Sequence, residues 1–202
     1  FKMILNKVHA DGGSINVSKL ARIGTVAQEA PSGTKSLVDT VLAADKERAQ
    51  LLDEAETATD PGRISNIHTR LADINAHSAP ARAGAILSGL GFSKEAQARP
   101  CSDFSGGWRM RVALAAVLFS KPDLLLLDEP TLGLAPSVAT QIFNVIPRLT
   151  QSNISILIAE QDLNRVLDIA HFGYVIENGR ITMHDTGSAL RSNPAVAEAY
   201  LG

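Results

Sequence analysis

The stretch Leu124-Leu-Leu-Leu-Asp-Glu-Pro130 decides the fold class of this 202-residue chain. Four consecutive leucines without an intervening polar residue are typical of a strand that is buried on both faces of a parallel sheet. Two acids, Asp128 and Glu129, follow directly, so both carboxylates are expected at the carboxyl edge of that sheet. Open α/β sheets bind their ligands at this edge. The stretch therefore predicts an α/β protein with a ligand site at Asp128 and Glu129.

Helical and strand patterns alternate on the carboxyl side of this strand. The predicted elements are helices at 136–149 and 163–170, a second buried strand at 154–159, and a hairpin of 174–177 with 180–183. The turn Asn178-Gly179 has the residues that tight hairpin turns favour. Such alternation predicts α/β architecture with right-handed crossovers.

The amino-terminal part carries weaker signals. Residues 1–7 resemble the end of a helix, and 14–17 and 22–27 are predicted as short strands, with Gln28 directly after the second. From 36 to 98 the pattern is helical, with apolar residues at i, i+3, i+7 and i+10 between Ile64 and Ile74. We interpret this part as a helical insert whose charged residues form a solvated face.

Composition limits the classes of function. The chain is 45% hydrophobic and 20% charged, which supplies enough apolar surface for one core, so a single domain over 1–202 is expected. Lys and Arg number 19 against 21 Asp and Glu, which argues against a basic field over the whole domain. The one cysteine, Cys101, suits a reducing cytosol, and no apolar run approaches the ~18 residues of a membrane span.

A second motif stands upstream of the leucine strand. Phe104-Ser-Gly-Gly-Trp108 opens a predicted helix, and glycines allow the backbone to approach a ligand closely. Free amides at a helix amino terminus, together with the helix dipole, favour a phosphate. We therefore predict that Ser105, Gly106 and Gly107 bind a phosphate group.

The two acids form a Walker B pattern. One carboxylate can hold Mg²⁺ through water while its neighbour orients the water that attacks a γ-phosphate. A solvated strand end with an acidic turn is the alternative that these residues alone leave open.

Together the motifs resemble those of ATP-binding cassette (ABC) ATPases. Gln28 stands at the place of the Q-loop, and the helical insert, signature and Walker B motifs follow in the order of that superfamily. The resemblance covers nearly the whole chain. It implies an ABC-type nucleotide-binding domain, that is, a parallel-sheet P-loop NTPase core with a helical insert, which binds ATP and Mg²⁺.

The resemblance also implies a role for each site residue. Glu129 would be the general base, Asp128 would hold magnesium, and Gln28 would contact magnesium and link the γ-phosphate to the insert. Gln161 occupies the place of the switch histidine. Its amide can donate a hydrogen bond to a γ-phosphate but cannot carry positive charge as imidazole can. Glu129, Gln161 and Gln28 are thus the predicted catalytic residues.

In this superfamily two cassettes stack head to tail. The resemblance therefore implies that Ser105 and Gly107 contact ATP held by a second cassette, while Asp128 and Glu129 act on their own. A non-catalytic cassette that only lends its signature motif to a partner remains a further alternative.

One family element is missing from the sequence. No G-x-x-x-x-G-K-[ST] string exists, and the nearest match, residues 32–36, is interpreted as an ordinary turn. Phe1-Lys-Met-Ile-Leu5 resembles the stretch just after a Walker A motif. We therefore expect an amino-terminally truncated cassette.

Two family likenesses meet in the chain. Residues 1–131, through Ile23–Glu29 and Phe104–Leu114, resemble the first cassette of ABC-F proteins. Residues 132–202 resemble the ATPase of branched-chain amino acid importers through Ile142-Phe143, Ala159–Gln161, Tyr174–Gly179 and Ala199–Gly202. The likeness changes where the lysines end, since all lysines precede residue 132. We interpret the chain as a chimera, natural or produced by cloning or sequence assembly, with its seam near 128–136.

The expected function is therefore MgATP hydrolysis in a cassette dimer, with an ABC-F-like partner such as the ribosome. The alternative is the ATPase subunit of a branched-chain amino acid importer, whose partner is a membrane permease. Either reading implies a cytoplasmic protein, and the second places it at the inner membrane. A third alternative is that the chain is an assembly artefact without cellular function.

Overall fold

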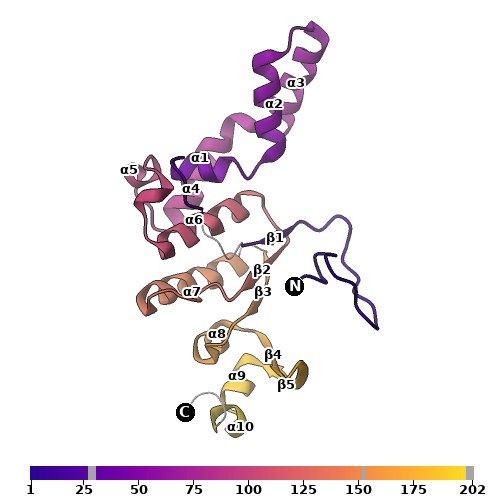
Figure 1. The fold of residues 1–202 in the computed structure, drawn as a ribbon, viewed down its shortest axis with the longest axis vertical. Helices are drawn as coiled ribbons and strands as arrows, with labels where there is room; N and C mark the ends of the chain where they lie inside the picture. Colours follow the sequence, from indigo (N-terminus) through magenta and orange to yellow (C-terminus); the bar gives the residue numbers. More distant parts are fainter. Residues whose placement is uncertain (27–30, 152, 199–202) are drawn as a thin grey trace.

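The computed structural model describes residues 1–26, 31–151 and 153–198. The molecule is elongated, with a helical hairpin at one end, a small parallel sheet in the middle and an antiparallel hairpin toward the other end (Figure 1). Within the described ranges, the helices all fall short of the length and apolar character that a membrane crossing requires.

A three-stranded parallel sheet lies at the centre. Its order is β1 (Ile23–Thr25), β2 (Leu124–Asp128) and β3 (Ser155–Ala159). In β2 the side chains of Leu125, Leu126 and Leu127 are 0%, 1% and 2% exposed. The leucine run is therefore the buried central strand, and the predicted α/β class is confirmed.

Helices build the main core together with the central strand. These are α6 (Gly106–Phe119), α7 (Pro136–Thr150), α1 (Leu37–Leu42) and α4 (Ala79–Gly89). The buried side chains of α1, α4, α6, β2 and α7 form one continuous apolar cluster. The start of α6 at Gly106 agrees with the sequence prediction, as does the extent of α7.

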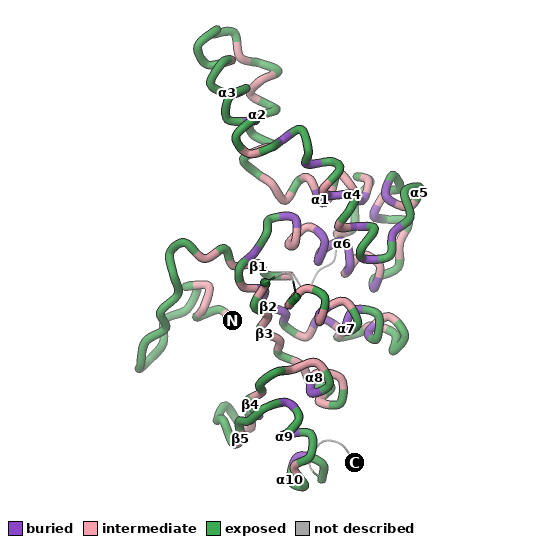
Figure 2. Tube along the Cα trace, turned by 180° about the vertical axis from the view of Figure 1, so that it is seen from behind, coloured by how far each residue is buried: buried purple, intermediate pink, exposed green. Residues whose placement is uncertain are grey.

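The predicted helical region contains a projecting hairpin of α2 (Lys46–Thr57) and α3 (Pro61–Asp73), followed by η1 (Ala76–Ser78) and, after α4, by α5 (Lys94–Gln97). Asp45 and Asp60 cap the two long helices. A satellite core around Ile67 and Leu71 joins them, and most of the hairpin surface is exposed (Figure 2). The hairpin is thus held together by its own contacts and extends away from the sheet.

The carboxyl-terminal part has a separate small core. It comprises α8 (Leu163–Ile169), β4 (Phe172–Glu177), β5 (Arg180–Thr186), α9 (Gly187–Arg191) and α10 (Pro194–Val196). Leu167, Val175, Leu190 and Val196 are its buried residues. The predicted antiparallel hairpin is confirmed, with strands longer than expected.

Three predictions for the amino-terminal part are wrong or too long. Residues 14–17 form no strand, and 1–7 form hydrogen-bonded turns rather than a helix end. Residues 11–20 are all exposed, so the segment 14–17 lacks the packing that stabilises a short strand. The strand predicted at 22–27 is limited to Ile23–Thr25, and Ala27 lies outside the described residues.

The strand predicted at 154–159 is present as β3, but the prediction that it is buried is wrong. In β3 half-buried residues alternate with exposed ones, and Leu157 is 39% exposed. The outer edge of β3 has no partner strand within the described residues.

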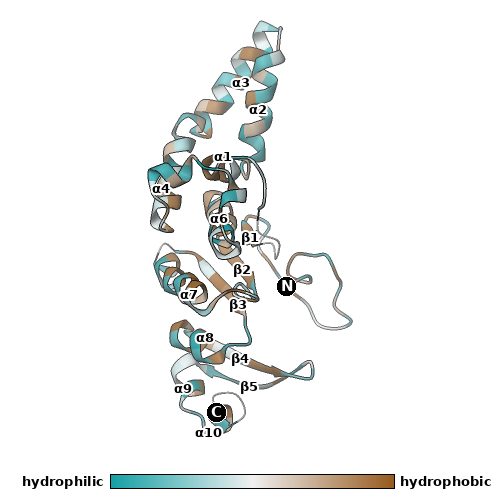
Figure 3. Cartoon of the chain, turned by 60° about the vertical axis from the view of Figure 1, so that its left-hand side comes forward, coloured by the Kyte–Doolittle hydropathy of each residue, from teal (hydrophilic) through white to brown (hydrophobic). Residues whose placement is uncertain are grey.

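Figure 3 shows the contrast between the apolar strands of the sheet and the mainly hydrophilic α2–α3 hairpin.

Candidate active site at the carboxyl edge of the sheet

The strands β2 and β3 end side by side, which sets the geometry of the site. Asp128 pairs with Ala159 in the parallel register, and the backbone N–H of Glu129 donates to the Ala159 carbonyl over 2.9 Å. Glu129 has a φ of 46°, in the left-handed region that costs a non-glycine residue energy. The chain thus turns sharply at Glu129, directly at the sheet edge.

Gln161 reaches the Glu129 carboxylate from the neighbouring strand end. Its Nε2 donates to Oε1 of Glu129 over 2.6 Å. A carboxylate held by an amide donor has a defined orientation. The structure therefore brings together the predicted general base and the residue at the predicted switch position, which lie far apart in the sequence.

Asp128 is exposed beside this pair and lines a cavity of about 210 Å³. The other lining residues are Phe1, Lys2, Leu5, Lys7, Thr25, Val26 and Leu126. No cluster of three acidic, His or Cys metal ligands exists among the described residues. Mg²⁺ needs only one or two carboxylates, since phosphate oxygens and waters complete its shell, so Asp128 fits this ion. Gln28, the second predicted ligand, lies outside the described residues.

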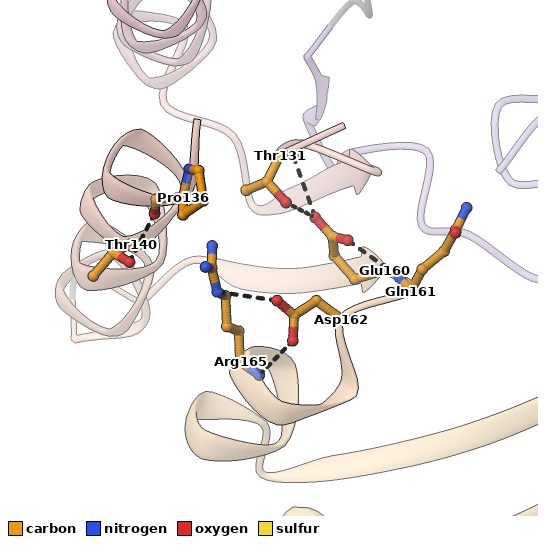
Figure 4. A network of polar contacts seen from close by, with 7 residues as sticks. All are labelled: Thr131, Pro136, Thr140, Glu160, Gln161, Asp162 and Arg165. Carbon is orange, nitrogen blue, oxygen red and sulfur yellow. Dashed lines mark hydrogen bonds and ion pairs between the residues drawn. The ribbon is translucent and has the colours of Figure 1, made fainter. Parts of the chain in front are cut away.

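Glu160 is a residue whose role the sequence did not reveal. Its Oε1 accepts hydrogen bonds from Thr131 N at 3.2 Å and Thr131 Oγ1 at 2.5 Å, and its Oε2 accepts from Gln161 N at 3.1 Å (Figure 4). Glu160 thereby ties the loop after the acids to the segment that carries Gln161. A polar residue at the end of the strand next to β2 was the signal for such a role.

The segment after Gln161 is fixed by a helix cap. Asp162 precedes α8, and its carboxylate accepts from Arg165 N at 3.3 Å and pairs with Arg165 Nε at 3.0 Å (Figure 4). Gln161 thus lies between two anchored acids. This local arrangement restrains the direction in which its side chain leaves the backbone.

The signature residues occupy the amino terminus of α6. Ser105 is exposed and makes no side-chain capping bond, so the first amides of this helix lack a cap from it. A Cβ on Gly106 would meet no atom within 4 Å, whereas one on Gly107 would lie 2.1 Å from Cγ1 of Val138. Gly107 is therefore required for the close packing of α6 on α7, and Gly106 borders open space.

Aromatic side chains anchor the signature helix to the insert. Phe92 packs edge-on against Phe104 and Trp108, with ring centroids 5.8 and 4.9 Å apart. Arg111 lies 4.3 Å from the Trp108 ring centroid and donates to the Leu90 carbonyl at 3.1 Å. Burial lowers the pKa of Arg111 from its ordinary value. The position of the signature is thus coupled to the end of α4.

The predicted site residues therefore divide into two groups. Asp128, Glu129 and Gln161 gather at the sheet edge, whereas Ser105 and Gly106 form an exposed helix end, without a hydrogen bond to the first group among the described residues. A parallel sheet with paired acids at its edge, an uncapped signature helix and a helical insert define the nucleotide-binding domain of the ABC class.

Comparisons with known proteins agree with this class. The family model described as ABC transporter matches residues 1–132. The chain belongs to the ABC transporter family.

Curated relatives are of two kinds. The high-affinity branched-chain amino acid transport ATP-binding protein BraG of Pseudomonas aeruginosa is 49% identical over 109 residues, covering 54% of this chain and 47% of the relative. The probable ATP-binding protein YheS of Escherichia coli K12 is 44% identical over 132 residues, covering 64% and 21%. Human ATP-binding cassette sub-family F member 3 is 43% identical over 117 residues, covering 52% and 16%. The chain therefore resembles both importer and ABC-F proteins, and spans half or less of these relatives' length.

Solved cassettes share the fold. The ADP conformation of MJ1267, an ATP-binding cassette of an ABC transporter, is 25% identical with a TM-score of 0.61, covering 89% of this chain and 68% of that one. The dimeric post-hydrolysis state of MJ0796 bound to ADP and Pi is 17% identical with a TM-score of 0.56, covering 82% and 63%. The second likeness shows the fold alone.

Proposed function

We propose that the chain forms one ABC nucleotide-binding domain over 1–202 that binds and hydrolyses MgATP in a head-to-tail cassette dimer. The observation that carries this proposal is the 2.6 Å hydrogen bond from Gln161 Nε2 to Glu129 Oε1 at the sheet edge. It joins two groups that phosphoryl transfer to water needs, a carboxylate and an amide donor, at the end of a buried strand.

In the proposed mechanism Glu129 orients the attacking water and accepts its proton. Gln161 holds the Glu129 carboxylate in one orientation and offers its amide N–H to a phosphate oxygen. Glu160 keeps Gln161 and Thr131 in a fixed relation through its three hydrogen bonds. A fixed carboxylate avoids the cost of reorientation when charge develops.

Asp128 and Gln28 are the proposed magnesium contacts. When bound there, Mg²⁺ would neutralise charge on the β- and γ-phosphates. The side chain of Asp128 is exposed toward the cavity that it lines, so its carboxylate is available to the ion or to a water in its shell.

The second cassette would meet the signature surface. Ser105 and Gly106 are exposed at the amino end of α6, and Leu132 in the loop after the acids is 65% exposed. Uncapped amides at the end of a 14-residue helix favour an anionic phosphate. These features support binding of ATP that a partner cassette holds.

The chain on its own is expected to bind ATP weakly because its sequence contains no P-loop. Each missing charge-assisted hydrogen bond removes roughly 1.5 to 3 kcal/mol, which moves an affinity from micromolar toward millimolar. Titration calorimetry with MgATP measures this directly. Tight binding of MgATP by the 202 residues would contradict the expectation that ATP affinity depends on a P-loop.

The test of catalysis uses a version with a strand and P-loop fused ahead of Phe1. In it Glu129→Gln should retain ATP binding and reduce steady-state turnover by about 10²-fold or more, since an amide cannot accept the proton. Glu56→Gln, at an exposed position on α2, is the matched control and should leave turnover unchanged. Unchanged hydrolysis by Glu129→Gln would refute the proposed base.

For the partner, the ABC-F proposal rests on the likeness to YheS and to sub-family F member 3, and the projecting α2–α3 hairpin is the proposed contact element. The hairpin has its own apolar core and two ion pairs, Arg63 with Glu54 and Arg70 with Glu47, each 2.6 Å long. It is therefore a preformed element for contact with a large partner, such as the ribosome. Residues 46–73 hold four Lys or Arg against six Asp or Glu, so a basic protein surface is the expected contact.

The importer alternative rests on the likeness to BraG and predicts binding to a membrane permease. Exchange of residues 29–104 for the matching importer segment separates the two. The parent fusion should bind ribosomes in a salt-dependent manner and the exchanged version should bind the permease. Binding of the parent to the permease, with ATP-dependent transport, would assign the chain to the importer group. Both alternatives place the protein in the cytoplasm, the second at the inner membrane.

A non-catalytic cassette that lends its signature to a partner is the remaining alternative. Mixing the unfused chain with an intact cassette distinguishes it. Stimulation of the partner's hydrolysis that Ser105→Arg abolishes would support signature lending without chemistry at Glu129. Turnover that depends on Glu129 in the fused version supports the catalytic proposal.

A further inference from the structure

One cavity in the described part of the chain lies away from the proposed ATP site. It has a volume of about 320 Å³ and lies where the α1–α2 linker, the segment after α3, α4 and the end of α6 meet. This is the root of the projecting hairpin in Figure 1. Its lining residues are Ala44, Asp45, Lys46, Ile74, Asn75, Arg82, Phe119, Ser120 and Lys121.

The charge around this cavity is predominantly positive. Lys46, Arg82 and Lys121 line it, and among the described residues none of the three forms an ion pair with a carboxylate. The one lining acid, Asp45, accepts the backbone N–H of Arg48 at 2.9 Å as the cap of α2. The carboxyl end of α6 adds a partial negative charge, and the amino end of α2 a partial positive one. An excess of cationic groups therefore remains.

Arg82, one of these cationic residues, has a side-chain N–H donor without an acceptor among the described residues. Its guanidinium lies 4.5 Å from the centroid of the Phe119 ring, a cation–π contact. Its Nε is covered and has no hydrogen-bond partner in the described structure. A buried N–H donor without an acceptor costs free energy. Because Nε is covered, an anionic oxygen in the cavity would be held by the terminal NH₂ groups of the guanidinium.

We propose that this cavity binds a diphosphate group, through Lys46, Arg82 and Lys121. Arginine and lysine are the side chains that recognise phosphate, arginine through its planar array of donors. A volume near 320 Å³ lies at the lower end of the roughly 300 to 1,000 Å³ range of small-molecule sites. It corresponds to the liquid volume of about ten waters, more than one phosphate group requires.

Binding would connect the hairpin to the core. Lys46 begins α2 in the projecting hairpin, Arg82 lies on α4, and Lys121 follows the end of α6. A diphosphate held by all three would restrict the angle of the hairpin relative to α6. The inference is independent of ATP hydrolysis because its residues lie outside the sheet edge and the signature.

Titration calorimetry of the whole chain with sodium pyrophosphate at constant ionic strength tests the proposal. Saturable binding is expected, and Lys46→Gln with Lys121→Gln should weaken it by about tenfold or more, since two charged contacts are lost. Lys19→Gln with Lys94→Gln is the matched control, because it removes equal charge from exposed positions that line neither this cavity nor the one beside Asp128. This control should bind pyrophosphate as the parent does.

Equal weakening by both double variants, or the absence of saturable binding, would overturn the proposal. The affinity comparison uses the two lysines, because Arg82→Gln would remove the contact with Phe119 and can disturb folding. Thermal unfolding verifies that each lysine variant folds. Slower hydrogen exchange of residues 44–48 and 74–82 with pyrophosphate is the expected second result, and protection at 128–132 instead would place the ligand elsewhere.

ADP distinguishes the source of the diphosphate. If the lysine pair weakens ADP as it weakens pyrophosphate, the cavity takes a diphosphate carried by a larger molecule. If ADP binding is insensitive to both lysines, the ligand is a free diphosphate.

Discussion

The neighbouring strands β2 and β3 have similar apolar sequences but different surroundings. The three central leucines of β2 are at most 2% exposed, whereas Leu157 in β3 is 39% exposed. Strand β2 has a partner strand on each side and belongs to the main core, while β3 pairs with one strand in the part of the chain that the structure describes. The difference teaches that an apolar run predicts strand formation, but its neighbours decide how far the run is buried.

The same contrast in burial holds for the elements on the two sides of the sheet. On one side of β2, strand β1 and helix α6 are in tight contact. Beyond β3, hairpin β4–β5 exposes Phe172, Tyr174 and Ile176 by 49%, 59% and 66%. We therefore expect mutations to cost most on the covered side of the sheet and least on the open side.

The largest effect is expected from truncation of the central strand. Leu125→Ala should lower the free energy of unfolding by about 2 to 5 kcal/mol, because it creates a cavity at a fully buried position of the main core. Leu157→Ala is the comparison and should cost no more than about 1 kcal/mol. Urea unfolding with both the midpoint and the slope measures the two. Equal losses would show that β3 is as well covered as β2.

A smaller loss is expected from overpacking of β1. A Cβ on Gly24 would lie 2.4 Å from Cγ1 of Val117 and 3.1 Å from Cβ of Pro122. Gly24→Ala should therefore destabilise by about 1 to 3 kcal/mol. Gly33→Ala, with no atom within 4 Å of the new methyl group, is the control and should stay near the parent. A harmless Gly24→Ala would mean that α6 is loosely packed on β1.

Polar substitution of the open hairpin should change stability little. Ile176 and Ile181 pair across β4 and β5 and are 66% and 58% exposed. Ile176→Thr and Ile181→Thr should each stay within about 0.5 kcal/mol of the parent in thermal unfolding, since little buried area is lost. A loss of about 2 kcal/mol or more would indicate that this face is covered in solution.

The smallest effect concerns an exposed pair at the start of the sheet. Arg22 donates to Asp123 at 3.2 and 3.1 Å and holds the pKa of the Asp123 carboxyl below its ordinary value of 3.8. Because the folded-state pKa is depressed, the stabilisation is complete above pH 3.8 and is lost as the pH falls through the folded pKa. Asp123→Asn should thus lower Tm slightly at neutral pH, and the difference should vanish in acid. A difference that persists in strong acid would contradict this origin.

Much of the candidate site follows from local sequence. The run from Leu124 to Pro130 predicts both the buried strand and the two acids at its end, since so apolar a run is typical of the middle of a parallel sheet and the acids follow it directly. The glycines at 106 and 107 likewise predict the start of α6. The roles of Asp128, Glu129, Gln161, Gln28 and the signature residues in catalysis remain predictions that the proposed variants test.

Local sequence determined the fold class and the order of most helices and strands, because periodicity and turn residues act over a few positions. Only the tertiary structure decided that Gln161 contacts Glu129, that Glu160 binds Thr131, and that Gly107 packs on Val138. It also decided that β3 is partly exposed and that residues 14–17 form no strand. These features depend on which segments become neighbours, and packing and strand pairing between distant residues are not encoded in any single stretch.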